Sequence, residues 1–132
     1  MRRIAILATI TLALAFPAIA VAKTVHYSFI LGHAGRTFKM RLAHTGRIEM
    51  VLRYSRLRNP RVDIIVSLAS PTDPEGNVIL DTAEKGSCKV AGDSFVCLEY
   101  ITGEPPGTYH LRMGLETKKR VITHLRLSWP AP

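Results

Sequence analysis

The side chains that could carry out chemistry are scattered along this chain of 132 residues and do not form a known catalytic motif. There is no Gly-x-Ser-x-Gly elbow, no His-Glu-x-x-His zinc motif and no glycine-rich phosphate or dinucleotide loop. None of the five histidines stands at metal-ligand spacing from another; they are His26, His33, His44, His110 and His124. We therefore expect a protein that is not an enzyme.

Four arginines fall within nine positions and could bind an anion. A guanidinium group holds a carboxylate, phosphate or sulfate through two parallel hydrogen bonds. The alternative is a solvated loop whose charges only aid solubility. The arginines that make up this candidate ligand-binding site are Arg53, Arg56, Arg58 and Arg61.

The two cysteines lie at the ends of the segment CKVAGDSFVC. A turn centred on Gly92 and Asp93 places Cys88 opposite Cys97 across a hairpin, and glycine at the first turn position suits a type II′ turn. In an oxidising compartment the natural state of such a pair is a disulfide. Because the bridge closes a short loop, we expect it to contribute about 2–3 kcal/mol of stability. No Cys-x-x-Cys redox motif is present.

Residues 1–22 have the composition of a secretory signal peptide. Arg2 and Arg3 give a positive start, an apolar run follows, and the small residues Ala20-Val21-Ala22 suit cleavage before Lys23. A second cut after Ala20 and a retained membrane anchor are alternatives. The pattern favours cleavage, so we expect export to the periplasm or full secretion, with no transmembrane helix retained.

Residues 23–132 provide enough chain for a single domain with one core. The formal net charge is +8, and it falls to +6 without Arg2 and Arg3. Segment 23–61 is basic, 62–110 is acidic and 111–132 is basic. Either this pattern forms a basic face for an anionic partner, or neighbouring strands of opposite charge neutralise each other across a sheet. In an exported protein the suitable partners are an envelope glycan, an anionic lipid head group or an acidic protein rather than nucleic acid.

Apolar residues alternate with polar ones through most of segment 23–132, which indicates half-buried strands. The run from Val62 to Ala69 is the clearest case, and Val78 and Leu80 resume its alternation after a turn rich in proline and glycine. Segment 48–54 would also suit a short helix, but its neighbours favour a strand. About nine strands are expected, at 24–31, 38–43, 48–54, 62–69, 78–80, 88–91, 94–100, 109–115 and 121–129. This pattern is typical of an all-β antiparallel sandwich or barrel.

Three segments resemble the bacterial pre-peptidase C-terminal domain and, more loosely, the P domain of proprotein convertases. They are VDIIVSL at 62–68, DPEGN at 73–77 and PGTYHLR at 106–112. The resemblance implies a jelly-roll-like β-sandwich that accompanies a secreted protease or binds a matrix polymer. We expect no catalytic domain to be attached.

We expect no cofactor, although some members of the resembled family bind calcium through loop carboxylates. The candidate ligands are hard oxygens. Asp73, Glu75 and Asn77 stand at alternate positions, with Asp81 nearby. An ordinary turn is the alternative, because the proline and glycine between them are common turn residues.

These observations favour an exported, non-catalytic binding module that recognises an anionic or polymeric partner in the envelope or outside the cell. A second hypothesis is an inhibitor or interaction protein that presses an edge strand or a loop into a secreted hydrolase. A third is a structural subunit of an envelope assembly.

Overall fold

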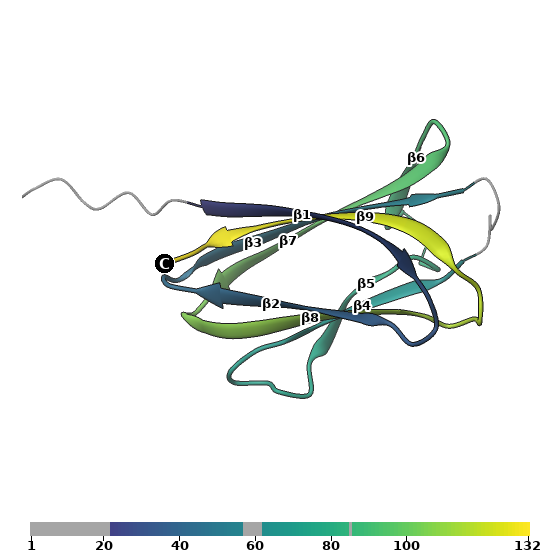
Figure 1. The fold of residues 1–132 in the computed structure, drawn as a ribbon. Helices are drawn as coiled ribbons and strands as arrows, with labels where there is room; N and C mark the ends of the chain where they lie inside the picture. The colour runs from purple at the N-terminus through teal and green to yellow at the C-terminus, as the bar shows by residue number, and fades with distance from the viewer. Residues whose placement is uncertain (1–21, 57–61, 85) are drawn as a thin grey trace, which may run out of the picture.

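The computed structural model describes residues 22–56, 62–84 and 86–132 and contains nine strands in two antiparallel sheets (Figure 1). Apart from Ala22, the predicted signal peptide lies outside these residues. Within the described ranges, no helix is long and apolar enough to cross a membrane. The strands are β1 (Ala22–Leu31), β2 (Arg36–Leu42), β3 (Gly46–Ser55), β4 (Ile64–Ala69), β5 (Asn77–Asp81), β6 (Cys88–Ala91), β7 (Ser94–Glu104), β8 (Gly107–Leu115) and β9 (Val121–Pro130).

The sheets pack face to face as a sandwich, which confirms the predicted fold class (Figure 1). One sheet has the strand order β1-β9-β3-β7-β6 and the other β2-β8-β4-β5. Segment 48–54, which the sequence left between strand and helix, lies within β3. It pairs with β7 on one side and with β9 on the other, so it lies in the middle of the larger sheet.

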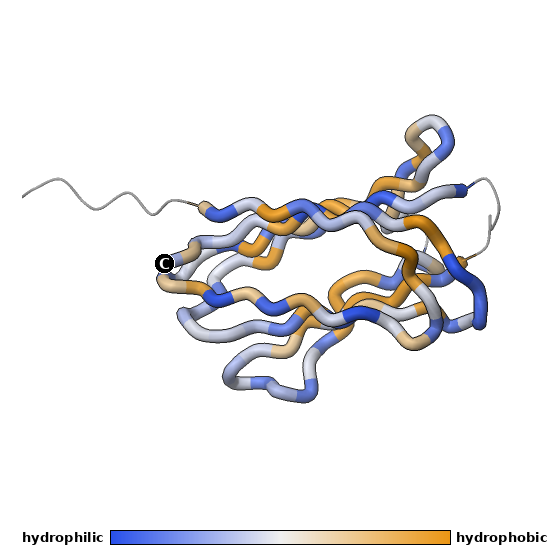
Figure 2. Tube along the Cα trace, in the orientation of Figure 1, coloured by the Kyte–Doolittle hydropathy of each residue, from blue (hydrophilic) through white to orange (hydrophobic). Residues whose placement is uncertain are grey.

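The core lies between the sheets and is built from alternate residues of nearly every strand. Hydrophobic residues recur along the strands of both sheets, as Figure 2 shows. This arrangement is what a period of two produces, because every second side chain then points into the sandwich. The large side chains that are fully buried include Ile48, Met50, Leu52, Ile64, Tyr109, Leu111, Leu125 and Leu127.

Two aromatic side chains fasten the ends of strands by hydrogen bonds. The indole Nε1 of Trp129, on the larger sheet, donates to the carbonyl oxygen of Arg41 on the smaller sheet at 3.1 Å. The Tyr109 hydroxyl donates to the carbonyl oxygen of Pro105 at 2.6 Å. Burial, followed by the hydrogen bond and charge of Glu104, raises the pKa of Tyr109 to about 12. The side chain therefore stays neutral and able to donate at physiological pH.

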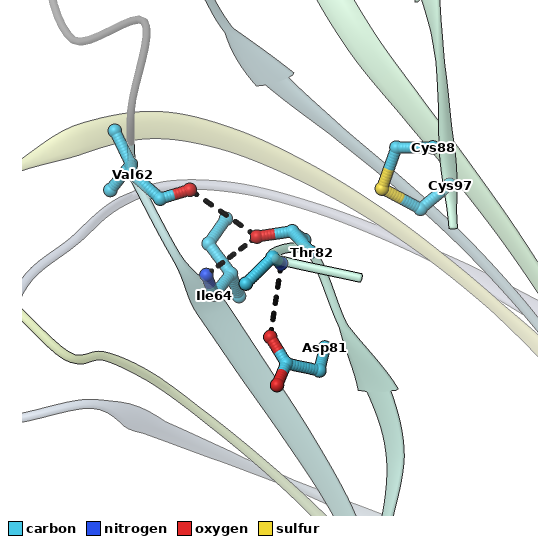
Figure 3. Close-up of a disulfide and its surroundings, with 7 residues drawn as sticks. Val62, Ile64, Asp81, Thr82, Cys88 and Cys97 are labelled. Carbon is cyan, nitrogen blue, oxygen red and sulfur yellow. Dashed lines mark hydrogen bonds between the residues drawn. A yellow bond between two sulfur atoms is a disulfide. The ribbon is translucent and has the colours of Figure 1, made fainter. Parts of the chain in front are cut away.

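The hairpin of β6 and β7 has the predicted register, with Cys88 opposite Cys97 and a disulfide between them (Figure 3). Gly92 has φ +60°, and no described residue other than glycine has a positive φ. A type I′ turn would require a positive φ at Asp93 as well, so the turn is type II′, as predicted. Cys97 is fully buried, so the disulfide joins a short outer strand to the core.

The prediction that Val78 and Leu80 both face the core is wrong. Leu80 is buried, but Val78 is exposed. The register of β5 against β4 shifts between the pairs Val66–Leu80 and Ser67–Val78, which leaves Ile79 as an extra residue. Such a β-bulge reverses the faces that the following residues present.

The strand order brings the basic segments together. Strands β1, β9 and β3 are neighbours in the larger sheet, and β2 and β8 are neighbours in the smaller one. Strands β1, β2, β3 and β9 come from the basic parts of the sequence and β8 spans the boundary at residue 110, whereas β4 to β7 come from the acidic part. Strand β3 also pairs with the acidic β7, so the neutralisation of opposite charges across the sheet stays a prediction.

Candidate anion-binding face

The outer face of the larger sheet carries a group of cationic and polar side chains from three adjacent strands. We call these five residues the His–Arg face: His26 and Ser28 on β1, Arg53 on β3, and His124 and Arg126 on β9. All five side chains are exposed, because they alternate with residues that point into the core. They border a shallow hollow of about 320 Å³, which Tyr27, Val51 and Leu125 also line.

The strand register fixes the arrangement of the His–Arg face as two rows. His26 lies opposite Arg126 in one row. His124 lies between Ser28 and Arg53 in the other row. Neighbours within a row are about 5 Å apart, and the rows are about 7 Å apart along the strands. Four potentially cationic groups therefore surround one patch with the dimensions of a small ligand.

Like charges placed directly opposite each other destabilise a sheet. His26 opposite Arg126, and His124 opposite Arg53, become such pairs whenever the imidazoles carry a proton. Glu49 offsets part of this charge, since its carboxylate lies 3.4 Å from Arg126 and 3.8 Å from Arg47. Exposed ion pairs of this kind contribute about 0–1 kcal/mol. The face therefore keeps a net positive charge that an anion could neutralise.

Ser28 and His124 form a hydrogen bond of 2.8 Å between Oγ and Nδ1. A serine–histidine pair can act as nucleophile and base when a third group orients the imidazole. Ser28 and Arg53 lie opposite His124, and its neighbours on the same face of β9 are Ile122 and Arg126. Glu49 pairs with Arg126 and not with His124. We therefore interpret the Ser28–His124 pair as a polar contact that orients the imidazole toward the hollow.

Apolar side chains flank the His–Arg face at both ends. Leu98 and Tyr100 on β7 are exposed by 46% and 48%. The Arg47 guanidinium lies 4.6 Å from the centre of the Tyr100 ring, within the range of a cation–π contact. At the other end, Ile30 lies opposite Ile122. The surface is thus a cationic patch bordered by apolar groups.

The structure separates the arginines of the predicted ligand-binding loop. Arg53 belongs to the His–Arg face. The Arg56 guanidinium donates to the carbonyl oxygen of Gly92 at 2.9 Å and lies 5.6 Å from the Phe95 ring. Arg56 therefore fastens the tip of the β6–β7 hairpin. Arg58 and Arg61 lie outside the described residues, so a role for this loop stays a prediction.

The predicted calcium ligands are placed in different parts of the β4–β5 region. The Asn77 amide donates to an Asp73 carboxylate oxygen at 2.6 Å, and Glu75 is exposed in the same turn. Asp81 lies four residues further along β5, about 13 Å from Asn77 in an extended strand. Its carboxylate accepts a hydrogen bond from the Ala83 amide. Over the part of the chain that the structure describes, no group of three or more His, Cys, Asp or Glu residues could hold a metal ion. Calcium binding stays a prediction.

Sequence reasoning found the parts of the His–Arg face but not their proximity. The alternation already places His26 and His124 on outward positions. They are 98 residues apart, and only the pairing of β1 with β9 brings them together. The basic character of both segments was the available signal, although charge alone does not specify which strands are neighbours.

Comparisons with known proteins support the fold and do not establish a family. No family model matches the sequence, and no curated protein matches it. Among solved structures, a family GH115 4-O-methyl-α-glucuronidase with specificity for decorated arabinogalactans matches 77% of this chain at 14% identity, with a TM-score of 0.50. The match spans 14% of the glucuronidase.

A second structure is the pre-peptidase C-terminal domain of a collagenase from Bacillus anthracis. The match covers 81% of this chain and 89% of that domain, at 14% identity and a TM-score of 0.48. At such low identity, the likeness to solved structures shows a β-sandwich fold and nothing of the ligand.

Proposed function

We propose that this protein is an exported, non-catalytic binding module and that its His–Arg face binds an acidic polysaccharide. The observation that carries the proposal is the meeting of His26, Arg53, His124 and Arg126 around one open hollow. Arginine binds carboxylate or sulfate groups in a bidentate manner, and histidine adds a further hydrogen-bond donor. The Cys88–Cys97 disulfide supports export, since such bridges persist in oxidising compartments.

A polysaccharide suits the shape and the chemistry of this surface. The hollow is shallow and open, so it fits a segment of an extended chain rather than an enclosed small molecule. Hydroxyl groups continue along the sheet, where the Thr24 and Ser128 side chains hydrogen-bond to each other at 3.1 Å. Tyr100 adds an exposed aromatic ring. A chain of sugars offers hydroxyl groups, apolar ring faces and acidic groups to these three kinds of side chain.

The test is a binding titration with three polymers that differ in charge. Polygalacturonate carries carboxylates, dextran sulfate carries sulfates, and dextran is neutral. We expect the exported protein to bind the first or second and not the third. We also expect affinity to fall as salt rises, because the contacts are exposed to solvent.

Two variants with the same loss of charge locate the binding site. Arg53→Gln with Arg126→Gln removes two cations from the His–Arg face. Lys39→Gln with Arg41→Gln removes two cations from β2, on the outer face of the smaller sheet. We expect the first pair to weaken binding about tenfold, equivalent to about 1.4 kcal/mol, and the second to have a smaller effect. Equal weakening by both pairs would refute a specific face, and no binding to either charged polymer would refute the proposal.

A further inference from the structure

The two sheets have four edge strands within the described residues: β1, β6, β2 and β5. An edge strand presents unpaired backbone N–H and C=O groups along its free side, and proteins usually protect it. Three of the edges have such protection. Strand β2 carries Arg36, Lys39 and Arg41; β5 has five residues and a bulge; and β6 has four residues and a disulfide to its neighbour.

Strand β1 is unprotected. It has ten residues, and its register against β9 runs without a shift from Ala22–Pro130 to Leu31–Val121. It contains no proline, and Lys23 is its one lysine, arginine or acidic residue. No described strand lies on the free side of β1. It is therefore a long, regular edge that could pair with another strand.

Two of the four inward apolar side chains of β1 lack the cover that an additional strand would give, whereas Phe29 and Leu31 are buried. Val25 and Tyr27 point inward and pack against the core, but they stay half-buried. On the outer side, Ile30 is exposed by 63%. By contrast, the inward residues of β2 (Phe38, Met40 and Leu42) are all buried. A strand placed beside β1 would bring its own side chains to within about 5 Å of these apolar groups.

We propose that the free edge of β1 binds an extended, acidic segment of a partner protein as a sixth strand of the larger sheet. Backbone hydrogen bonds would supply the affinity, and alternate side chains the specificity, as in other cases of strand addition. The charge of this edge selects the occupant. Lys23 and His26 lie on β1, and Arg126 lies opposite His26 on β9. Strand β1 contains no acidic residue, so a second copy of this strand would bring no carboxylate to Lys23, whereas an acidic strand would neutralise it.

The test uses a labelled ten-residue peptide in which glutamate alternates with valine, added to the exported protein. We expect saturable binding by fluorescence anisotropy and slower hydrogen exchange at the amides of β1. A peptide of the same length and charge in which proline replaces two central valines should not bind, since proline cannot complete the ladder of hydrogen bonds. Equal binding of both peptides, or unchanged exchange along β1, would overturn the proposal.

Two pairs of substitutions test whether the peptide binds at the edge of β1. Thr24→Glu with Ile30→Glu places negative charge on β1 and changes none of the five residues of the His–Arg face, although both positions border that face. Thr37→Glu with Thr108→Glu adds two acids to β2 and β8 of the smaller sheet. We expect at least tenfold weaker binding of the glutamate–valine peptide for the first pair and a smaller change for the second. Equal losses would overturn the assignment to β1, as would light scattering that finds a dimer dissociated by the first pair alone. If that pair prevents folding, hydrogen exchange of the unaltered protein still tests the proposal.

Discussion

The outer faces of the two sheets carry similar charge but arrange it differently. On the smaller sheet, Arg112 lies between Thr37 and Ser67, and Arg41 lies opposite Thr108. Hydroxyl side chains thus flank Arg41 and Arg112, while Lys39 lies opposite His110 as a single pair. On the larger sheet, two such pairs, His26 with Arg126 and His124 with Arg53, lie in adjacent rows. The comparison teaches that the clustering of such pairs, rather than the number of cations, distinguishes a candidate binding face from a solvated surface.

The largest effect should come from the core that supports both faces. Leu125 lies beneath the His–Arg face and Leu111 beneath the smaller sheet's face, and both are fully buried. We expect Leu125→Ala and Leu111→Ala each to lower the free energy of unfolding by about 2–5 kcal/mol, because each leaves a cavity. Urea denaturation measures this.

Ile122→Ala on the exposed side of β9 serves as the control and should cost less than about 1 kcal/mol. If Leu125→Ala were as mild as this control, the larger sheet would not share the core with the smaller one. The two faces would then not be opposite surfaces of one sandwich.

The next largest effect on stability is expected in the larger sheet only, because the disulfide joins two of its strands, β6 and β7. Cys88→Ala with Cys97→Ala should lower the free energy of unfolding by about 2–3 kcal/mol. Thiol titration of the unaltered protein should find no free thiol before reduction. Two free thiols in the native protein would contradict the disulfide.

The smallest expected effect on stability comes from Tyr109 in the smaller sheet, and it depends on pH. The pKa of Tyr109 is raised from 10 to about 12, so the native protein favours the neutral phenol more than the unfolded chain does. The stability that this pKa difference contributes is fully present below pH 10 and is lost as the pH rises from 10 to about 12. Tyr109→Phe should also remove the hydrogen bond to Pro105, at a cost of about 1 kcal/mol at pH 7.

Ultraviolet titration combined with unfolding at pH 7 and pH 11 checks the Tyr109 prediction. The difference in stability between the unaltered protein and Tyr109→Phe should shrink at pH 11. A phenolate that forms near pH 10 in the native protein would show that Tyr109 is not held neutral, and the hydrogen bond would then contribute little.

Local patterns in the sequence predicted the strands and the hairpin disulfide. Alternation sets the faces of β1, β3 and β9, and a two-residue turn determines the register of Cys88 and Cys97. These features depend on residues close together in the chain. The bulge at Ile79 could not be predicted, because Val78, Ile79 and Leu80 are all apolar and do not specify which of them face the core.

The candidate site could be predicted only in part, because it depends on strand order. His26, Arg53 and His124 come from three segments that are far apart in sequence and adjacent in the sheet. The clustered arginines of the β3–β4 connection were a weaker guide. The Arg53 side chain lies on the outer face of the larger sheet, whereas Arg56 donates a hydrogen bond to the carbonyl oxygen of Gly92 in the β6–β7 hairpin.

The most direct test of the His–Arg face is nuclear magnetic resonance of the ¹⁵N-labelled protein titrated with oligogalacturonate. The account predicts that the largest shifts fall on His26, Arg53, His124 and Arg126, including the imidazole resonances of the two histidines. It also predicts small shifts at Lys39, Arg41 and Arg112 on the smaller sheet. Largest shifts on the smaller sheet, or uniform shifts over both faces, would contradict it.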